Sequence, residues 1–563
     1  MSFENDESPY CIDFTKNIGR ANKCLDKNSQ TIPDLIYLKA RIKDRIALAF
    51  DAEKVGLTFE KCKTEMETIA AGFLACGLKP GDRILIAGSN YSQVFLCALG
   101  ASRAGLIFTL ANPGFPNSEV FANILNKGAY KAVVCFPVAK LREYLYGLLL
   151  ELHPGIKVSE RGNIQSEALP TLTHIFLAEE DCAHAGCFTL SDVYLKATPE
   201  MLKRLPSPNS FDENRVACLQ FTQGGSGEPK LVALTHFQLL NGARAVVHAF
   251  KVKREHILSC ALPLFRIPIF TLCCLAPFLT ECRTVFPEPS PLPRNLYQSI
   301  QKYQCTTLIT NGAALRLLLK VSSASKAKLA SIQRLMLIGE RVPQELLFTI
   351  KKQCVNAQII AVGYLLTETG SIPIMADEQC DFRKNVGRAI AGYEADLEPI
   401  ADASLFASGL GELKIRPFQG STFAGYSPKL AANEEWIYTG DICRRDFQGN
   451  FEVVAQKEDL IYDAGNRLVR HWDTEKNLIR SELLKGCQLV SVAPGEPMIA
   501  VCVCKNQQSH LHFVRSELLK ICNNAKVPIP QLWAFVDDYP RVNCRIQKWK
   551  LRQMIRDNLF PVF

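Results

Sequence analysis

The sequence has no block of lysine and arginine residues of the kind that binds along a nucleic-acid backbone. Its 563 residues include 65 basic and 56 acidic side chains, so the formal net charge of +9 is a mild excess for a long chain. Such an excess favours at most small anionic ligands such as nucleotides. We therefore expect no nucleic-acid partner.

The sequence also lacks an apolar run long enough to cross a membrane. Its most apolar stretch, Ile257–Phe278, is interrupted by Arg266 and three prolines and falls short of the roughly 20 residues required. The segment Met1–Glu7 is acidic and has no apolar core, so it is neither a signal peptide nor a transit peptide, and Phe560–Phe563 is not a peroxisomal address. We expect a cytoplasmic protein without a transmembrane segment, and peripheral contact with a membrane stays open.

No Cys-x-x-Cys pair has a second pair or a histidine pair at zinc-finger spacing. The 22 cysteines are scattered, and several lie inside apolar runs such as Leu272–Leu275 and Val501–Cys504. We expect them to be small buried side chains in a reducing compartment rather than metal ligands.

Hydrophobic residues make up 48% of the chain and charged residues 21%, which is typical of a folded globular protein. Short apolar runs alternate with helical patterns, as in the strand expected at 84–88 and the helix expected at 91–103. Such units recur near 131–136 and 305–338 and predict an α/β fold with parallel-rich sheets and flanking helices.

The chain is too long for a single hydrophobic core, so we expect at least two domains. From about residue 456 the elements become shorter and more charged. We predict a large N-terminal domain at 1–455 and a small α+β C-terminal domain at 456–563.

The most informative stretch is a glycine-rich loop that follows the apolar strand Leu219–Phe221. Glycines let backbone N–H groups close around phosphate oxygens, hydroxyl groups add donors, and a lysine supplies positive charge. Pro229 excludes a Walker A loop, because that motif has glycine before its lysine. A plain surface turn is the alternative for the loop considered alone. The candidate phosphate-binding residues are Thr222, Gln223, Gly224, Gly225, Ser226, Gly227, Glu228, Pro229 and Lys230.

Together with Leu234–His236, this loop resembles the Thr-Ser-Gly-Ser/Thr-Thr-Gly-x-Pro-Lys phosphate loop of the adenylate-forming superfamily. That superfamily contains acyl-CoA synthetases, luciferases and the adenylation domains of peptide synthetases. Three positions differ: Gln223 replaces a serine, Gly225 replaces a hydroxyl residue, and Leu231 replaces a glycine. Because backbone N–H groups make much of the phosphate contact, the resemblance still implies phosphate binding.

Two later motifs follow in the family's order. Tyr364–Glu368 resembles Tyr-Gly-x-Thr-Glu, which implies that Thr367 approaches the α-phosphate and that Glu368 binds Mg²⁺. Taken alone, a Thr-Glu pair is usually the start of a surface helix. Trp436–Asp441 resembles Trp-x-x-Thr-Gly-Asp, in which the carboxylate accepts hydrogen bonds from both ribose hydroxyls.

Further segments resemble medium-chain acyl-CoA synthetases in particular, so the resemblance covers nearly the whole chain. It implies the ligands ATP, Mg²⁺, CoA and a small carboxylic acid, and a C-terminal domain that acts as a mobile lid. The matching segments are Leu57–Phe59, Gly77–Asp82, Ala111–Pro113, Val386–Arg388, Gly411–Leu413, Tyr539–Arg552 and, more weakly, Gly339–Glu340.

The C-terminal segment departs from the family at the lysine that supplies positive charge for adenylation. The family has Pro-x-Thr-x-x-Gly-Lys, whereas the segment from Pro540 here is one residue shorter. Cys544 takes the glycine position and Arg545 the lysine position. A planar guanidinium is not equivalent to a compact ammonium aimed at one oxygen.

The predicted hinge departs as well. Gln456 stands where the family has an arginine that contacts the ribose, which predicts weaker ATP binding, while Glu458 and Asp459 fit an acidic hinge. Gly465, where family members let the pantetheine thiol pass, is kept. Arg266 stands where the subgroup has a histidine near the acyl site, or else is a solvated loop charge.

Three hypotheses follow. The first is an acid–thiol ligase that joins a medium-chain-like carboxylic acid to CoA through an acyl-adenylate. The second is a catalytically impaired family member that binds a nucleotide or acyl ligand for regulation, and the third is an adenylating enzyme with an acceptor other than CoA. By resemblance alone the location would be mitochondrial. The expected catalytic residues are Lys230, Thr367, Glu368 (also the metal ligand) and Arg545, with Asp441, Gln456 and Gly465 at the ligands.

Overall fold

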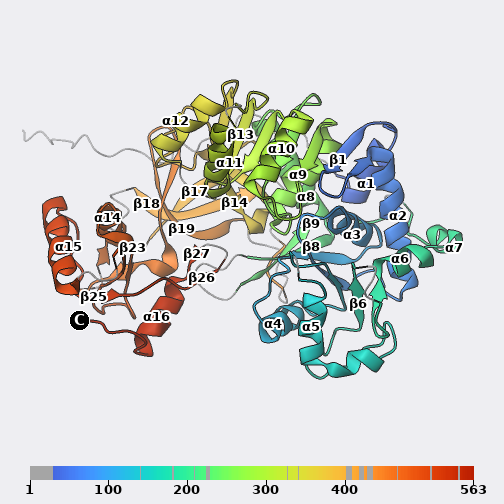
Figure 1. The fold of residues 1–563 in the computed structure, drawn as a ribbon, viewed down its shortest axis with the longest axis horizontal. Helices are drawn as coiled ribbons and strands as arrows, with labels where there is room; N and C mark the ends of the chain where they lie inside the picture. Colours follow the sequence, from blue (N-terminus) through green and yellow to red (C-terminus); the bar gives the residue numbers. More distant parts are fainter. Residues whose placement is uncertain are drawn as a thin grey trace, which may run out of the picture.

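A computed structural model shows two large sheets with helices between and around them, a smaller antiparallel sheet, and a C-terminal part at one end (Figure 1). The structure describes residues 29–139, 141–179, 183–207, 210–222, 229–325, 328–339, 342–400, 409–417, 424–427, 435–465, 467–506, 510–542 and 545–563.

The first large sheet has seven strands, and all neighbours pair in parallel except the last two. The final strand runs antiparallel because β8 and β9 flank the glycine-rich loop directly. In sheet order the strands are β7 (Phe188–Thr189), β6 (His174–Leu177), β5 (Ala132–Cys135), β3 (Arg83–Ala87), β4 (Ile107–Ala111), β8 (Val216–Phe221) and β9 (Leu231–Thr235).

The second large sheet has nine strands, with six consecutive parallel strands at its centre. Antiparallel strands form both edges. In sheet order they are β16 (Arg388–Ala389), β15 (Ser371–Ala376), β14 (Ile359–Leu366), β13 (Arg334–Ile338), β12 (Thr307–Thr310), β10 (Ile257–Cys260), β11 (Arg283–Phe286), β1 (Ile46–Phe50) and β2 (Val55–Thr58).

The main hydrophobic core lies between these two sheets and contains side chains of α2 (Phe59–Ala75), α3 (Ser92–Arg103), α8 (His236–Ala249) and α9 (Ile267–Thr280). Separate cores lie on the outer faces. The remaining helices before the C-terminal part are α1 (Ile32–Lys39), α4 (Ser118–Gly128), α5 (Tyr144–Leu152), η2 (Pro154–Val158), α6 (Leu190–Lys196), α7 (Pro199–Lys203), α10 (Pro293–Tyr303), α11 (Gly312–Ala324), α12 (Gln344–Gln353) and η3 (Thr367–Thr369).

A four-stranded antiparallel sheet leads from the nine-stranded sheet to the C-terminal part. Its strands are β17 (Tyr393–Pro399), β18 (Leu410–Pro417), β19 (Ile437–Arg445) and β20 (Phe451–Gln456). The C-terminal part contains η4 (Lys457–Asp459), β21 (Ile461–Tyr462), β22 (Leu468–Val469), α14 (His471–Leu478), β23 (Leu484–Val490), β24 (Ile499–Cys504), α15 (Leu511–Ala525), β25 (Leu532–Phe535), β26 (Arg541–Val542), β27 (Arg545–Ile546) and α16 (Lys548–Arg556).

Two hydrophobic clusters in this C-terminal part contain only residues from Ile461 onward. Another small cluster joins Leu410 and Ile442 to Leu468 and Trp472, across the predicted domain boundary. The boundary between 455 and 456 stays a prediction.

The α/β fold with parallel-rich sheets is confirmed. The strand expected at 84–88 is β3, and the helix expected at 91–103 is α3. Eighteen cysteines lie in the described residues, none of these forms a disulfide, and all but Cys380 and Cys504 are buried. Among the described residues there is no cluster of three potential metal ligands. No helix in this part of the chain combines the length and the apolar character that a membrane span requires.

The buried imidazole of His236 predicts acid sensitivity. Its Nδ1 accepts a hydrogen bond from the Ile32 N–H at 3.2 Å, and burial lowers its pKa to about 4. An unfolded histidine titrates near about 6.5, so between pH 6.5 and 4 the unfolded state binds more protons. The free energy of unfolding should therefore fall as the pH falls through this range, by up to about 3 kcal/mol for this group.

Urea titrations at several pH values test this expectation. His236→Asn keeps a hydrogen-bond acceptor but removes the titration, so it should flatten the fall in unfolding free energy below pH 6.5. The exposed His248 provides the matched control, since His248→Asn should leave the pH dependence unchanged. An unchanged slope in His236→Asn would contradict this assignment.

Candidate active site

The two ends of the glycine-rich loop are joined by backbone and side-chain hydrogen bonds. The Thr222 N–H donates to the Lys230 carbonyl at 2.8 Å, and the Lys230 N–H donates to Thr222 Oγ1 at 2.9 Å. These bonds continue the β8–β9 ladder by one residue and hold Lys230 at the mouth of the loop. Residues 223–228 lie outside the described residues, so their predicted phosphate contacts stay predictions.

Lys230 belongs to a chain of contacts that ends at Glu368. The Lys230 Nζ lies 5.2 Å from the centroid of the Tyr426 ring, and the Tyr426 hydroxyl donates to Glu368 Oε1 at 3.0 Å. Tyr426 is held by backbone pairing with Val232 on β9. No motif in the sequence marks Tyr426, so this contact was not predicted.

Glu368 lies in the short helix η3 (Thr367–Thr369), which follows β14. Burial raises the pKa of its carboxyl group, while the Tyr426 hydroxyl and the Lys230 charge act in the opposite direction. A nearby cation favours the ionised form of such a carboxyl group, as Lys230 does here. Mg²⁺ usually binds one or two carboxylates together with substrate phosphates, so a single Glu368 fits that ion only with a nucleotide present.

Asp441 lies on β19, is 8% exposed, and has a hydrogen bond at each carboxylate oxygen. The Tyr364 hydroxyl donates to Oδ2, and the Gln456 Nε2 donates to Oδ1 at 2.6 Å. Gln456 lies directly opposite Asp441 on the neighbouring strand β20. Both carboxylate oxygens of Asp441 are therefore in contact with protein donors, and the predicted ribose contact stays a prediction.

The predicted residues thus gather from distant parts of the chain. Lys230 and Asp441 both act electrostatically on the carboxyl group of Glu368, and Tyr364, which bonds to Asp441, lies on the strand that leads into η3. Burial beside Asp441 raises the pKa of the Tyr364 hydroxyl well above its usual range, so it stays a donor. The result is a cluster that contains one lysine, two carboxylates and two tyrosines.

Close backbone packing requires two glycines of the family-like segments Val386–Arg388 and Gly411–Leu413. Gly387 has φ +95°, and a Cβ there would lie 2.0 Å from the Met375 carbonyl oxygen. A Cβ at Gly411 would lie 2.7 Å from the Glu398 carbonyl oxygen. These glycines therefore belong to the framework of the sheets rather than to the chemistry.

Ion pairs flank the predicted hinge on both sides. Glu412 accepts from the Gly440 N–H at 3.2 Å and from Lys457 Nζ at 2.6 Å, which ties η4 to the four-stranded sheet. On the other side, Arg552 of α16 donates to Asp459 at 2.9 Å, with both side chains mostly buried. The acidic hinge residue Asp459 is thereby held to the last helix.

Three further predicted residues make no side-chain hydrogen bond or ion pair with this cluster in the described part of the chain. Gly465 lies in a turn after β21, where its N–H donates to Asp463. Arg545 begins β27 and pairs through its backbone with Val542, and its side chain lies outside the described residues. Thr367 begins η3, beside Glu368. The roles of all these residues stay predictions.

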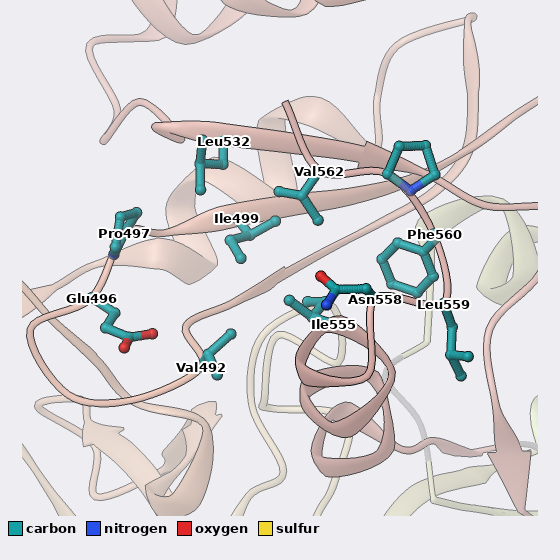
Figure 2. A pocket seen from close by; sticks show the side chains of 11 residues that line it. Val492, Glu496, Pro497, Ile499, Leu532, Ile555, Asn558, Leu559, Phe560 and Val562 are labelled. Atoms are coloured by element: carbon teal, nitrogen blue, oxygen red, sulfur yellow. The ribbon is translucent and has the colours of Figure 1, made fainter.

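A groove of about 710 Å³ lies elsewhere, on the C-terminal part (Figure 2). Figure 2 shows mostly apolar side chains around it from β24, β25, the end of α16 and the chain terminus, including Ile499, Leu532, Ile555 and Phe560. Glu496 is the single charged residue in its lining, and no predicted site residue lines it. We therefore assign no chemistry to this groove.

The sheets and the gathered residues define a protein of the adenylate-forming class. The family model described as AMP-binding enzyme matches residues 39–426. The chain therefore belongs to the AMP-binding enzyme family. Proteins named as acyl-CoA ligases are among its relatives. The family resemblance inferred from the sequence motifs is confirmed.

Three known proteins illustrate the relationship. The mitochondrial medium-chain acyl-CoA ligase of Mus musculus is 25% identical over 560 residues, which cover 95% of this chain and 88% of that protein. An anthranilate CoA ligase in complex with anthranoyl-AMP has a TM-score of 0.73 at 17% identity and covers 94% of this chain and 98% of its own. ATP-bound MatB from Rhodopseudomonas palustris has a TM-score of 0.72 at 18% identity, with coverages of 93% and 99%.

Proposed function

We propose that this chain is an ATP-dependent acid–thiol ligase that activates a medium-chain-like carboxylic acid as an acyl-adenylate and transfers the acyl group to CoA. The observation that carries the proposal is the gathering of Lys230, Tyr426, Glu368 and Asp441 in one charged cluster. Membership of the AMP-binding enzyme family supports the reaction class, and the names of the mouse relative and the anthranilate ligase support the acid and CoA as substrates.

The geometry of the cluster suits the binding of ATP and the compensation of its negative charge. In the adenylation step a carboxylate oxygen forms a bond to the α-phosphorus of ATP, the bond to the bridging oxygen breaks, and pyrophosphate leaves with that electron pair. Lys230 would hold phosphate oxygens, Asp441 would accept the ribose hydroxyls, and Glu368 would hold Mg²⁺, which supplies charge stabilisation when bound. In the second step the CoA thiolate would attack the acyl carbon and AMP would leave.

We further propose that residues 456–563 form the lid whose movement separates the two steps. The ion pairs on either side of η4 would then be remade between steps. Limited proteolysis with and without ATP plus acid tests this proposal, because a hinge near 456 predicts a cleavage pattern that changes with ligands. A pattern that is identical in all states would contradict it.

Formation of acyl-CoA tests the proposed reaction. Purified protein would be incubated with Mg-ATP, CoA and saturated acids of increasing chain length, and the thioesters measured by mass spectrometry. We expect the highest yield with medium-chain acids. Thioester formation with none of the acids would exclude the ligase, and adenylate without thioester would indicate an acceptor other than CoA.

Fractionation of cells that express the protein tests the cytoplasmic location against the mitochondrial one.

A second candidate function is nucleotide or acyl-ligand binding without turnover. It is favoured by the contacts at Asp441, because Tyr364 and Gln456 already donate to its two oxygens and so compete with the ribose hydroxyls for the acceptor sites of this carboxylate. The competition predicts weak nucleotide affinity. This candidate is supported if ATP binds measurably and no acid supports adenylate formation.

Gln456 allows a direct test of this competition. Gln456→Arg should raise ATP affinity by about tenfold, because a guanidinium can bond Asp441 and still offer a charge-assisted donor to the ligand. Calorimetric titration with ATP measures the change. Gln448→Arg introduces the same charge in the exposed β19–β20 turn and should leave affinity within about twofold. Equal gains in both variants would show a general effect of charge.

A further inference from the structure

The helices on the outer face of the nine-stranded sheet carry an uneven share of the positive charge. The whole chain has 65 basic and 56 acidic residues, yet no acidic residue occurs in the sequence from Pro289 to Gly339. α10, α11 and α12 lie beside one another near the top of Figure 1 and share a core with one face of this sheet. Glu345 is the acidic residue of these three helices, whereas their basic residues are Arg294, Lys302, Arg316, Lys320, Lys351 and Lys352.

Helical spacing separates the buried and the exposed residues of α11. Leu315 and Leu318 are fully buried in the core beneath the helix. Leu317 and Lys320 lie three residues apart on the other side of the helix, where both are exposed, Leu317 by 49%. The outward side of α11 therefore presents an apolar and a basic side chain next to each other.

The same arrangement recurs on α12, which lies against α11. Leu346 and Ile350 pack into the shared core, whereas Phe348 between them is 71% exposed. The exposed residues that follow Phe348 at helical spacing are Lys351, Lys352 and, just after the end of the helix, Val355. Neither of these two lysines has a salt bridge to another described residue, so their charges face solvent.

We propose that this α11–α12 surface docks on the anionic surface of a lipid membrane; it comprises Leu317, Lys320, Phe348, Lys351, Lys352 and Val355. The lysine ammonium groups would meet the negative headgroups, while the Phe348 ring enters the boundary between headgroups and acyl chains. A soluble polyanion matches the lysines but offers no apolar layer for an exposed phenylalanine.

The contact is peripheral, because no helix in the described part of the chain is long and apolar enough to span a membrane. The residues of the charged cluster around Glu368 do not belong to the α11–α12 surface. Docking therefore goes beyond the proposed reaction and does not depend on it.

Sedimentation with lipid vesicles tests the docking without any substrate. Full-length protein would be mixed at about 0.1 M salt with sucrose-loaded vesicles of phosphatidylcholine, either alone or with about 30% phosphatidylserine. We expect binding to the anionic vesicles to be at least about tenfold stronger than to the neutral ones and to fall at about 0.5 M salt. Lys351→Gln/Lys352→Gln should weaken it about 25-fold, since each lysine near such a surface contributes about fivefold.

Phe348→Ala keeps all charges and should weaken binding to the anionic vesicles about tenfold through the lost apolar contact. The matched controls are Lys476→Gln/Lys485→Gln and Phe513→Ala, which remove exposed lysines and an exposed phenylalanine from the C-terminal part and should change binding less than about twofold. Because all these side chains are exposed, the melting temperatures should stay the same.

Three results would overturn the proposal. The first is wild-type protein that binds neither kind of vesicle or binds both equally. The second is a loss in Lys351→Gln/Lys352→Gln no larger than in its matched control. The third is binding to polyglutamate but not to vesicles, reduced by the lysine substitutions and not by Phe348→Ala, which would assign the surface to an acidic protein.

Discussion

Replacing Lys230 by glutamine is expected to lower ATP–pyrophosphate exchange by at least about 100-fold, because the lysine is a positive group at the end of the glycine-rich loop that we propose binds the phosphates. The change removes the charge near Glu368 and leaves the loop backbone bonded to Thr222. In the proposed adenylation step, contacts to the phosphates and compensation of their charge would both weaken while negative charge develops on the leaving pyrophosphate. Exchange of labelled pyrophosphate into ATP measures the effect.

Two comparisons make this result specific. Tyr426→Phe keeps the ring against Lys230 and removes the bond to Glu368, so its loss of exchange should be smaller, about tenfold. Lys251→Gln removes an exposed lysine in the turn after α8 and should leave the rate unchanged. Exchange by Lys230→Gln within about threefold of the wild-type rate would contradict the assignment.

Replacing Asp441 by alanine is expected to weaken ATP binding by at least about 30-fold, since two charge-assisted hydrogen bonds to the ribose would be lost. The loss is limited because Tyr364 and Gln456 already donate to these oxygens in the free protein, which reduces the net gain from binding a ribose there. Asp441→Asn should lose less, because one amide oxygen remains as an acceptor.

A comparison of nucleotides isolates the ribose contact. Wild-type protein should bind 2′,3′-dideoxy-ATP much more weakly than ATP, whereas Asp441→Ala should bind the two nucleotides with nearly equal affinity. If the variant still discriminates between them as strongly as wild type, another residue accepts the ribose hydroxyls.

The sequence allowed the fold to be predicted because its signals are local. Apolar runs such as Ile84–Ala87 followed by a helical pattern predict β-α units, and parallel sheets bury such runs on both faces. Gly387, in the family-like segment Val386–Arg388, is a local signal of the same kind. Its backbone has a positive φ, which favours glycine at that position. The family resemblance followed from the order of these segments.

The contacts inside the site were not predictable in the same way. Tyr426 meets Glu368 only because β9 brings the segment around 426 beside Val232, a long-range pairing that no spacing rule describes. From the sequence, Gln456 was only a glutamine at the position of a family arginine. The structure shows that its amide donates a hydrogen bond to Asp441, which lies opposite it on the neighbouring strand. Side-chain partners across sheets depend on register, and register is set by the whole fold.

The most direct test of the central claim is ATP–pyrophosphate exchange by the purified wild-type protein in the presence of Mg²⁺ and octanoate. Exchange requires only the adenylation half-reaction, so it is independent of CoA and of the second step. The proposed ligase predicts exchange that depends on the acid, on Mg²⁺ and on Lys230. No exchange with any acid of the panel, alongside measurable ATP binding, would contradict it and leave a ligand-binding protein.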